Sequence, residues 1–410
     1  MVIALVKIDE VYENILIADK VLKNIVYHTP LDHSHTLSRI TGGKVFLKLE
    51  NLQRTSSFKI RGAYYTINKL LRSREINLCV AASSGNHAQG VALASILHKL
   101  KSIIVMPEYT PITKIMATRR YGGKVVLYGK SYDEAYAKAV EICEKERGVF
   151  IHPFNDYNII AGQGTIGLEI FRDLSMVDVV IVPIGGGGLI AGIATALKRL
   201  RPSVKIIGVQ PKGSPAMYKS FKNKRLMKSI SLNTIADGVA VKSPGEKPFE
   251  IILKLVDDIF LVEEDDIVRA LFLLLERSKC VAEPAGALSV ALLLSGQMDV
   301  KNKRVVALIS GGNIDPDLLI RVVNRALILE GRRVKIKGIV PDRPGILREV
   351  LDTFTSVKAN IITIDHDRSS IYLKPNETEV TITLELPKPE KLDIILKNLK
   401  KKGFYFQKYS

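Results

Sequence analysis

Short apolar runs that alternate with amphipathic stretches constrain this chain more than any other feature of its sequence. Most of these runs are followed by glycine, serine or proline and then by a helical pattern. They are Asn77–Ala82, Ser102–Met106, Lys124–Tyr128, Val177–Ile184, Val204–Gln210 and Arg304–Ile309. Short continuous apolar runs are typical of buried parallel strands. The pattern predicts an α/β fold, in which ligands bind at the carboxyl ends of the strands.

The last part of the chain follows a different pattern. Strands are predicted over 334–340, 360–367, 377–386 and 404–409, and helices over 345–357 and 390–401. This order, βαββαβ, is that of a ferredoxin-like unit. The sequence therefore predicts a first domain over 1–325, a linker over 326–333 and a second domain over 334–410.

The basic charge of the chain does not indicate a nucleic-acid partner. Lysine and arginine number 60 and aspartate and glutamate 42, which gives a formal net charge of +18. The densest basic runs, 219–228 and 397–402, contain one aromatic residue, Phe221. One aromatic is too few for a surface on which bases stack. A solvated, lysine-rich surface is the simpler interpretation.

The cysteines and the N-terminus bear on location. Cys79, Cys143 and Cys280 are far apart and form no CxxC pair, so neither a disulfide framework nor a zinc site is indicated. The N-terminal segment MVIALVKIDE meets charged residues too soon for a signal peptide, and no uncharged run reaches the ~18 residues of a membrane span. We expect a cytoplasmic protein with no membrane partner.

A lysine beside a predicted helix is the first candidate for chemistry. The stretch SSFKIRGA at residues 56–63 places Lys59 among serine, phenylalanine and glycine, just before a helix predicted over 63–71. A partly buried amine there would have a lowered pKa. Such an amine can form a Schiff base with a carbonyl cofactor.

Three loops rich in small residues follow predicted strands. They are ASSGNHAQG at 82–90, GGGGL at 185–189 and SGGN at 310–313. Small residues at a helix start let backbone N–H groups approach an anion. The glycine run lacks both the acidic partner of a dinucleotide fingerprint and the Gly-Lys-Ser/Thr of a nucleotide loop. A cradle for a single phosphate fits it better.

Together these motifs resemble those of the fold-type II (tryptophan synthase β-like) enzymes that use pyridoxal phosphate (PLP). SSFKIRGA, SSGNHAQG, IAGQGTIGLEI, VPIGGGGLIAG and ISGGNID occur in the family's order. They are most like those of threonine dehydratases (threonine ammonia-lyases) and serine racemases. The resemblance covers about residues 10–325 and implies a smaller lobe, about 55–152, inserted in a larger one. The tail resembles an ACT domain, through PDRPGIL at 341–347.

The resemblance implies a role for each motif. Lys59 would bind PLP as a Schiff base and remove the substrate's Cα proton, and Phe58 would lie beside the cofactor. Asn86 would contact the ring oxygen O3′, and Ser310 the ring nitrogen. The phosphate would be held by the backbone of Gly185, Gly186, Gly187, Gly188 and Leu189. The substrate carboxylate would be bound by Ser83, Ser84, Gly85, Asn86 and His87.

The implied activity is β-elimination of L-threonine to 2-oxobutanoate and ammonia, with L-serine as a second substrate. Ser84 keeps a serine racemase or serine dehydratase open, because racemases use a serine there as an acid or base. The stretch 210–216, where such racemases bind a metal, has no carboxylate, so no metal is expected. A sensor of amino acids without catalytic activity is a third interpretation.

The ACT resemblance implies a regulatory domain. A small amino-acid effector would be bound by Asp342, Pro344, Gly345 and Asn360. Because ACT units usually pair edge to edge, the resemblance also implies a homodimer or homotetramer.

Overall fold

The chain divides into two compact units, residues 1–315 and 316–410. The computed structural model describes residues 8–230 and 232–409, so the expectation about the N-terminal segment falls largely outside it. Within the described ranges, no helix is both long and apolar enough to cross a membrane. The expected linker at 326–333 coincides with the end of a helix, a turn with Gly331 at φ 66°, and the start of a strand.

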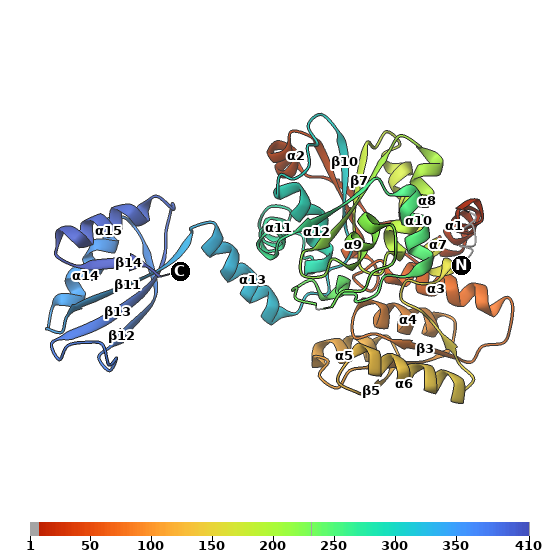
Figure 1. Ribbon diagram of the computed structural model, residues 1–410, viewed down its shortest axis with the longest axis horizontal. Helices are drawn as coiled ribbons and strands as arrows, with labels where there is room; N and C mark the ends of the chain where they lie inside the picture. The colour runs from red at the N-terminus through yellow and green to blue at the C-terminus, as the bar shows by residue number, and fades with distance from the viewer. Residues whose placement is uncertain (1–7, 231, 410) are drawn as a thin grey trace. The chain divides into compact units, whose positions relative to one another are not determined.

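The first unit contains two sheets, as Figure 1 shows. The larger has the order β1-β2-β10-β7-β8-β9. Its strands are parallel except for β1, which pairs with β2 in the antiparallel sense. They are β1 (Leu31–His33), β2 (Lys44–Leu49), β7 (Val179–Pro183), β8 (Lys205–Pro211), β9 (Asp258–Val262) and β10 (Arg304–Ile309). The parallel α/β prediction is confirmed.

The smaller sheet is parallel throughout, in the order β5-β4-β3-β6. Its strands are β3 (Leu78–Ala82), β4 (Lys101–Met106), β5 (Lys124–Leu127) and β6 (Val149–Phe150). Cys79 and Ala81 pack in one apolar cluster, and Val80 and Ala82 pack in another. Side chains alternate along a strand, so both faces of this sheet are buried, which explains its continuous apolar runs.

Helices cover both sheets. Those of the larger lobe are α1 (Ile8–Leu22), α2 (His35–Thr41), α7 (Tyr157–Asp173), α8 (Gly188–Leu200), α9 (Ala216–Asn223), α10 (Glu246–Leu255), α11 (Glu264–Arg277) and α12 (Pro284–Leu294), with short 3-10 turns η1 (Glu50–Leu52) and η2 (Asp237–Val239). Those of the smaller lobe are α3 (Lys59–Leu71), α4 (Asn86–Leu97), α5 (Ile112–Arg120) and α6 (Tyr132–Lys145).

Helix α3 begins at Lys59, not at Ala63 as the sequence pattern predicted. Phe58 already has helical dihedral angles, φ −61° and ψ −16°, and its carbonyl accepts from the Arg61 N–H at 3.1 Å. Lys59 therefore stands in the first turn of a helix. Its backbone is helical, although the small residues around it resemble a loop.

A buried ionic network ties this first turn to the larger lobe. Arg61 is fully buried and donates to both carboxylate oxygens of Glu50, at 2.7 and 2.8 Å. It also donates to both oxygens of Glu169, at 2.6 and 3.1 Å. Lys48 on β2 adds an ion pair to Glu169 at 2.7 Å. Two cations thus face two carboxylates, which is the compensation that buried charges need.

Helices α3 and α7 approach each other very closely beside this network. A Cβ atom on Gly162 would lie 2.6 Å from the Gly62 Cα. Gln163 accepts a hydrogen bond from the Gly62 N–H at 3.2 Å. The glycines of the IAGQGTIGLEI motif therefore serve helix packing, a function that its resemblance to a family motif did not indicate.

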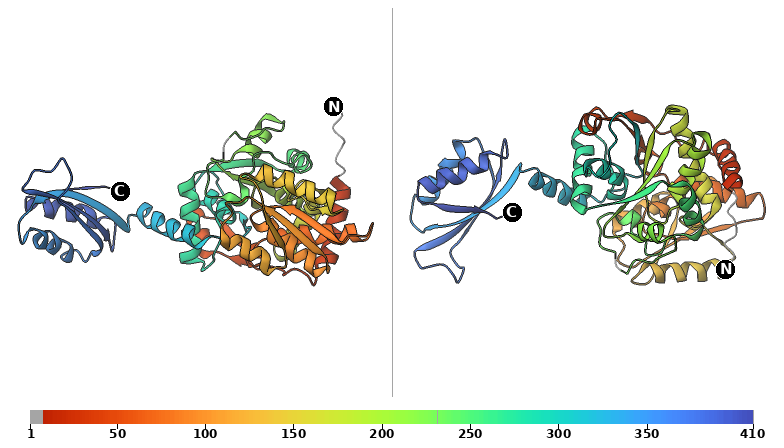
Figure 2. Two further views of the ribbon diagram at one scale, coloured as in Figure 1. Left: turned by 90° about the horizontal axis from the view of Figure 1, so that it is seen from below. Right: turned by 45° about the horizontal axis from the view of Figure 1, so that its top comes forward.

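The second unit contains α13 (Pro316–Leu329) and a four-stranded antiparallel sheet in the order β12-β13-β11-β14. The remaining elements are β11 (Arg333–Pro341), α14 (Ile346–Thr355), β12 (Asn360–Asp367), β13 (Glu377–Glu385), α15 (Lys391–Lys401) and β14 (Tyr405–Lys408). Both views of Figure 2 place α14 and α15 on one face of this sheet. The predicted βαββαβ order and the ferredoxin-like topology are confirmed.

Candidate active site

A cavity of about 460 Å³ in the first unit brings the four sequence motifs together. Lys59 comes from α3, Ser84 and Asn86 from the end of β3 and the start of α4, and Ser310 from the end of β10. Every residue predicted for the cofactor or the substrate carboxylate lines it, including Phe58, Ser83, Gly85, His87, Gly185, Gly186, Gly187, Gly188 and Leu189. The cavity thus lies where the carboxyl ends of strands from both sheets meet, as parallel sheets predict.

The side-chain amine of Lys59 lies at the cavity wall. Its Nζ donates to the Pro153 carbonyl at 3.0 Å and lies 5.1 Å from the centre of the Phe58 ring. Burial lowers the pKa of Lys59 to about 8, although the nearby Glu283 carboxylate acts to raise it. An amine with this pKa is about one-tenth neutral at pH 7 and half neutral near pH 8, so it is a far more available nucleophile and base than an ordinary lysine.

The glycine run is shaped by its surroundings. Gly187 has φ 98°, which glycine adopts without strain, and it caps the start of α8. A Cβ atom on Gly186 would lie 2.2 Å from the Phe154 ring, and one on Gly188 would lie 3.0 Å from the Phe154 carbonyl oxygen. The first N–H groups of α8 have no acceptor within the helix and carry its positive dipole end. The run therefore fits the phosphate of PLP.

A second helix start faces the same cavity. Helix α4 begins at Asn86, and a Cβ atom on the preceding Gly85 would meet nothing within 4 Å. The Ser83 hydroxyl accepts from the Gly85 N–H at 3.2 Å, which shapes the turn. An open turn at a helix N-terminus can bind a carboxylate.

The His87 ring does not take part in that anion site through its charge. The ring is buried, and its Nε2 donates to the Ile151 carbonyl at 2.8 Å. Burial, together with the charge of Lys59, lowers the pKa of His87 to about 3, so the ring is neutral. The contribution expected of His87 to carboxylate binding is thus confined to its backbone N–H.

Asn86 is held from both sides. Its Nδ2 donates to the Glu283 carboxylate at 2.6 Å, and its Oδ1 accepts from Asn313 Nδ2 at 2.7 Å. Ser310 is buried, with 4% of its surface exposed, and its carbonyl accepts from the Phe58 N–H at 3.3 Å. The protein's own hydrogen bonds therefore hold the Asn86 side chain and the backbone of Ser310, the two residues predicted to contact the cofactor ring.

Glu283 and Asn313 were not predicted as site residues. The signal for Glu283 is weak: a carboxylate followed by proline at the start of α12, a helix whose residues up to Leu293 are all buried. An acid at such a position is itself buried and needs a partner. Asn313 belongs to the SGGN loop that the sequence singled out, but its contacts cannot be read from spacing.

Ion pairs at the rim join the two lobes. Lys114 on α5 pairs with Asp237, and Lys242 lies 3.4 Å from Asp133 on α6. These four side chains line the cavity. Exposed pairs of this kind contribute little stability, about 0–1 kcal/mol each.

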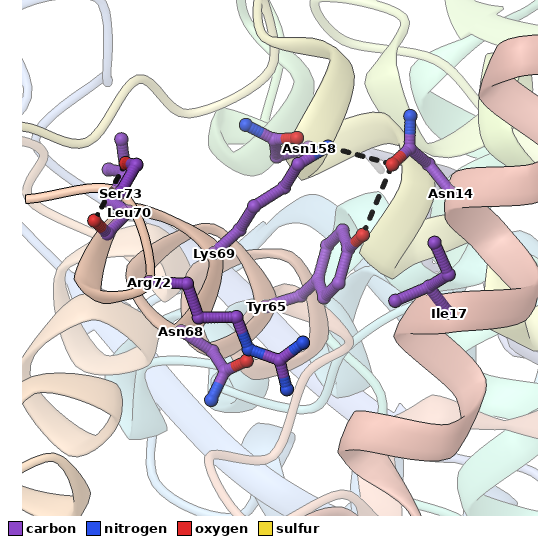
Figure 3. A pocket seen from close by; sticks show the side chains of 9 residues that line it. All are labelled: Asn14, Ile17, Tyr65, Asn68, Lys69, Leu70, Arg72, Ser73 and Asn158. Carbon is purple, nitrogen blue, oxygen red and sulfur yellow. Dashed lines mark hydrogen bonds between the residues drawn. The ribbon is translucent and has the colours of Figure 1, made fainter.

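A separate cavity lies between α1, α3 and α7 and shares no residue with the first. Figure 3 shows Lys69 and Tyr65 pointing toward Asn14. The Asn14 Oδ1 accepts from Lys69 Nζ at 2.7 Å and from the Tyr65 hydroxyl at 3.3 Å. Lys69 thus hydrogen-bonds to the neutral side-chain amide of Asn14, and the glycine run and serine loops near Lys59 do not line this second cavity.

The fold and the site define a PLP-dependent enzyme. The family described as pyridoxal-phosphate dependent enzymes matches residues 22–311, and the chain belongs to this family. The first unit places the Lys59 amine and the glycine-rich start of α8 in one cavity.

Relatives with assigned activities are similar over most of the chain. An L-threonine ammonia-lyase of Thermotoga maritima is 46% identical over 392 residues, which is 96% of this chain and 98% of the relative. The catabolic L-threonine dehydratase of Escherichia coli K12 is 46% identical over 312 residues, 76% of this chain and 94% of the relative. The first relative is thus matched across both units.

Solved structures share the fold of the first unit. Threonine deaminase isoform 2 of Solanum lycopersicum has a TM-score of 0.74 at 39% identity, covering 78% of this chain and 88% of that chain. A maize serine racemase has a TM-score of 0.72 at 33% identity, covering 78% of this chain and 98% of that chain.

The lowered pKa of Lys59 predicts how the apoenzyme takes up PLP. The neutral amine is the attacking form, so the rate of incorporation should rise with pH and level off above about pH 8, where Lys59 is deprotonated. Stopped-flow absorbance of apoenzyme mixed with PLP measures this rate. A rate that continues to rise beyond pH 10, as for an ordinary lysine, would contradict the assignment.

Proposed function

We propose that the chain is an L-threonine ammonia-lyase, which converts L-threonine to 2-oxobutanoate and ammonia and accepts L-serine as a second substrate. One observation carries the proposal: the Lys59 amine lies in a cavity that two helix N-termini, those of α4 and α8, also line. Two such ends suit two anions, a cofactor phosphate and a substrate carboxylate. The threonine ammonia-lyase relative matched over 96% of this chain supports the choice of substrate.

The residues that the sequence motifs place in the cavity have distinct roles in this reaction. PLP, when bound, supplies an electron-withdrawing ring that acidifies the Cα proton of an attached amino acid. Lys59 binds the cofactor and, once its amine is free, removes that proton. Ser310 offers a hydroxyl rather than a carboxylate to the ring nitrogen. The start of α4, from Ser83 to His87, orients the substrate through its carboxylate.

Serine racemisation is the second candidate, and Ser84 favours it. Ser84 lines the same cavity as Lys59, and a hydroxyl there can exchange a proton with the opposite face of the substrate. The similarity to a maize serine racemase gives this candidate further support.

We place the enzyme in the cytoplasm, where its three free cysteines stay reduced.

We also propose that the second unit is a regulatory ACT domain that binds a small amino acid. The turn before α14 supports this role, because Gly345 has φ 94° and a Cβ atom there would meet nothing within 4 Å. Asp342 in this turn is paired with Arg368 at 2.9 Å. An effector carboxylate would bind at the N-terminus of α14, after Pro344.

The strand register explains why this site would need two copies of the chain. Asn360 pairs with Glu385, which pairs with Arg333 at the start of β11. Asp342 and Gly345 follow the other end of β11. Within one unit, Asn360 thus lies at the opposite end of the sheet from the turn. An effector in contact with both would lie between subunits, which supports a homodimer or homotetramer.

Replacement of Lys59 tests the proposed lyase. Lys59→Ala should lower the turnover of L-threonine at least about 10⁴-fold, because one amine serves as both nucleophile and base. Release of 2-oxobutanoate, coupled to a dehydrogenase, measures turnover. Lys69→Ala on the same helix is the matched control and should keep near-normal activity. Wild-type enzyme that turns over L-serine but not L-threonine would contradict the substrate.

Replacement of Ser84 separates the two candidate activities. Ser84→Ala should abolish any conversion of L-serine to D-serine and leave threonine elimination within about threefold of wild type, because Lys59 alone handles the L-face proton. Chiral chromatography of the serine pool measures racemisation. If elimination is lost as well, the Ser84 hydroxyl, and not only the backbone of this turn, is needed for substrate binding or for elimination.

Removal of the second unit tests the regulatory proposal. A chain that ends at Glu330 should bind PLP and turn over threonine but no longer respond to isoleucine or valine. In the full chain, coupling should change the apparent KM by roughly 5- to 150-fold. The alignment of the E. coli relative over 94% of its length with only 76% of this chain supports a catalytic unit that works alone. A full-length enzyme that responds to no amino acid would contradict the proposal.

A further inference from the structure

Glu283 is a buried carboxylate that the proposed reaction leaves without a role. It precedes α12, and 5% of its surface is exposed. Its side chain makes no capping hydrogen bond to that helix. Its backbone N–H, by contrast, donates to the Gly311 carbonyl at 3.0 Å. The backbone alone thus joins α12 to the neighbouring loop, and the carboxylate must have another purpose, because burying it is costly.

The carboxylate is directed at Asn86. Its Oε1 accepts from Asn86 Nδ2 at 2.6 Å, a short distance typical of a charge-assisted hydrogen bond. Glycine backbones give it room: a Cβ atom on Gly311 would lie 2.4 Å from Oε1, and one on Gly238 would lie 3.5 Å from it. Any larger residue at Gly311 would displace the carboxylate.

A chain of hydrogen bonds gives the Asn86 amide one orientation. Asn313 donates to the Asn86 Oδ1 at 2.7 Å and to the Thr55 carbonyl at 2.8 Å. The Asn86 amide therefore has its oxygen toward an amide donor and its nitrogen toward a carboxylate. If the Asn86 amide were flipped, its oxygen would face the Glu283 carboxylate and its nitrogen would face Asn313 Nδ2, so neither hydrogen bond could form. One N–H of the amide nitrogen remains to donate into the cavity.

We propose that Glu283 is a positioning residue, which holds the Asn86 amide so that its remaining N–H donates to the oxygen on the PLP ring. The inference rests on the assignment of Asn86 to that oxygen, and it does not depend on threonine as the substrate.

The charges around Glu283 fit this role. Burial and the Asp237 carboxylate raise the pKa of Glu283 to about 7, whereas Asn86, Lys114 and Lys59 lower it. These groups come from η2, α4, α5 and α3. The carboxyl is therefore largely ionised above neutral pH, where its hydrogen bond to Asn86 is strongest.

Titration of apoenzyme variants with PLP tests the inference, with fluorescence for the dissociation constant and the visible absorbance of the bound cofactor as a second readout. Glu283→Ala should weaken PLP binding roughly 10- to 100-fold, the loss expected for a hydrogen bond to a charged group. Glu283→Gln keeps an acceptor oxygen and should stay within about threefold of wild type. Glu263→Gln, at the N-cap of α11, is the matched control outside the cavity.

A double-mutant cycle separates positioning from a structural role. If Glu283 acts through Asn86, Glu283→Ala should cost little further PLP affinity in a chain that already carries Asn86→Ala. An equal loss in both backgrounds would overturn the inference. Asn313→Ala, which frees the other side of the amide, provides a second test should Glu283→Ala fail to fold. It should weaken PLP binding in the same direction, and unchanged binding would overturn the inference.

Borohydride reduction distinguishes this result from a failure of the enzyme assignment. Wild-type protein should retain PLP covalently at Lys59 after reduction, whatever its substrate. Retention of PLP at Lys59 with no effect of any Glu283 variant would overturn the positioning role and leave the enzyme assignment intact.

Discussion

The site depends on the ion pairs that the fully buried guanidinium of Arg61 makes with two carboxylates. It is bound by two carboxylates, Glu50 after β2 and Glu169 on α7, and both belong to the larger lobe. Loss of one partner of a buried pair typically costs 3–5 kcal/mol, because the other charge is left uncompensated. Arg61 follows Lys59 by two residues, about half a helical turn, in the first turn of α3. The network therefore ties the first turn of α3, which carries the Lys59 amine, to the larger lobe.

Burial acts on two neighbouring groups in opposite directions and brings them to similar pKa values. It lowers the pKa of Lys59 to about 8 and raises the pKa of Glu283 to about 7. Each charge partly offsets the shift of the other. A cationic amine and a carboxyl whose pKa values normally differ by about six units are thus both titratable near neutral pH. Burial disfavours the charged form of each group, which explains why the amine and the carboxyl shift in opposite directions.

Much of this arrangement can be predicted from the sequence, and the remainder depends on contacts between distant residues. The apolar runs predicted strands such as β3 and β10 to within a residue, because both faces of the sheets are buried. The motif loops were placed correctly because they follow those strands. Glu283 was missed because its partner Asn86 is distant in sequence, and a glutamate before proline is ordinary at a helix start. The start of α3 was placed too late, because small residues around Lys59 resemble a loop.

The glycine run carries a lesson about how such sequences evolve. Gly186 is required because the Phe154 ring fills the space of a side chain, and a Cβ atom on Gly188 would press against the Phe154 backbone at 3.0 Å. Purifying selection at these two positions would therefore persist in a descendant that had lost its cofactor, for as long as Phe154 stayed in place. An intact glycine run in a homologue is therefore a record of inherited packing and is not by itself evidence that the homologue binds the cofactor.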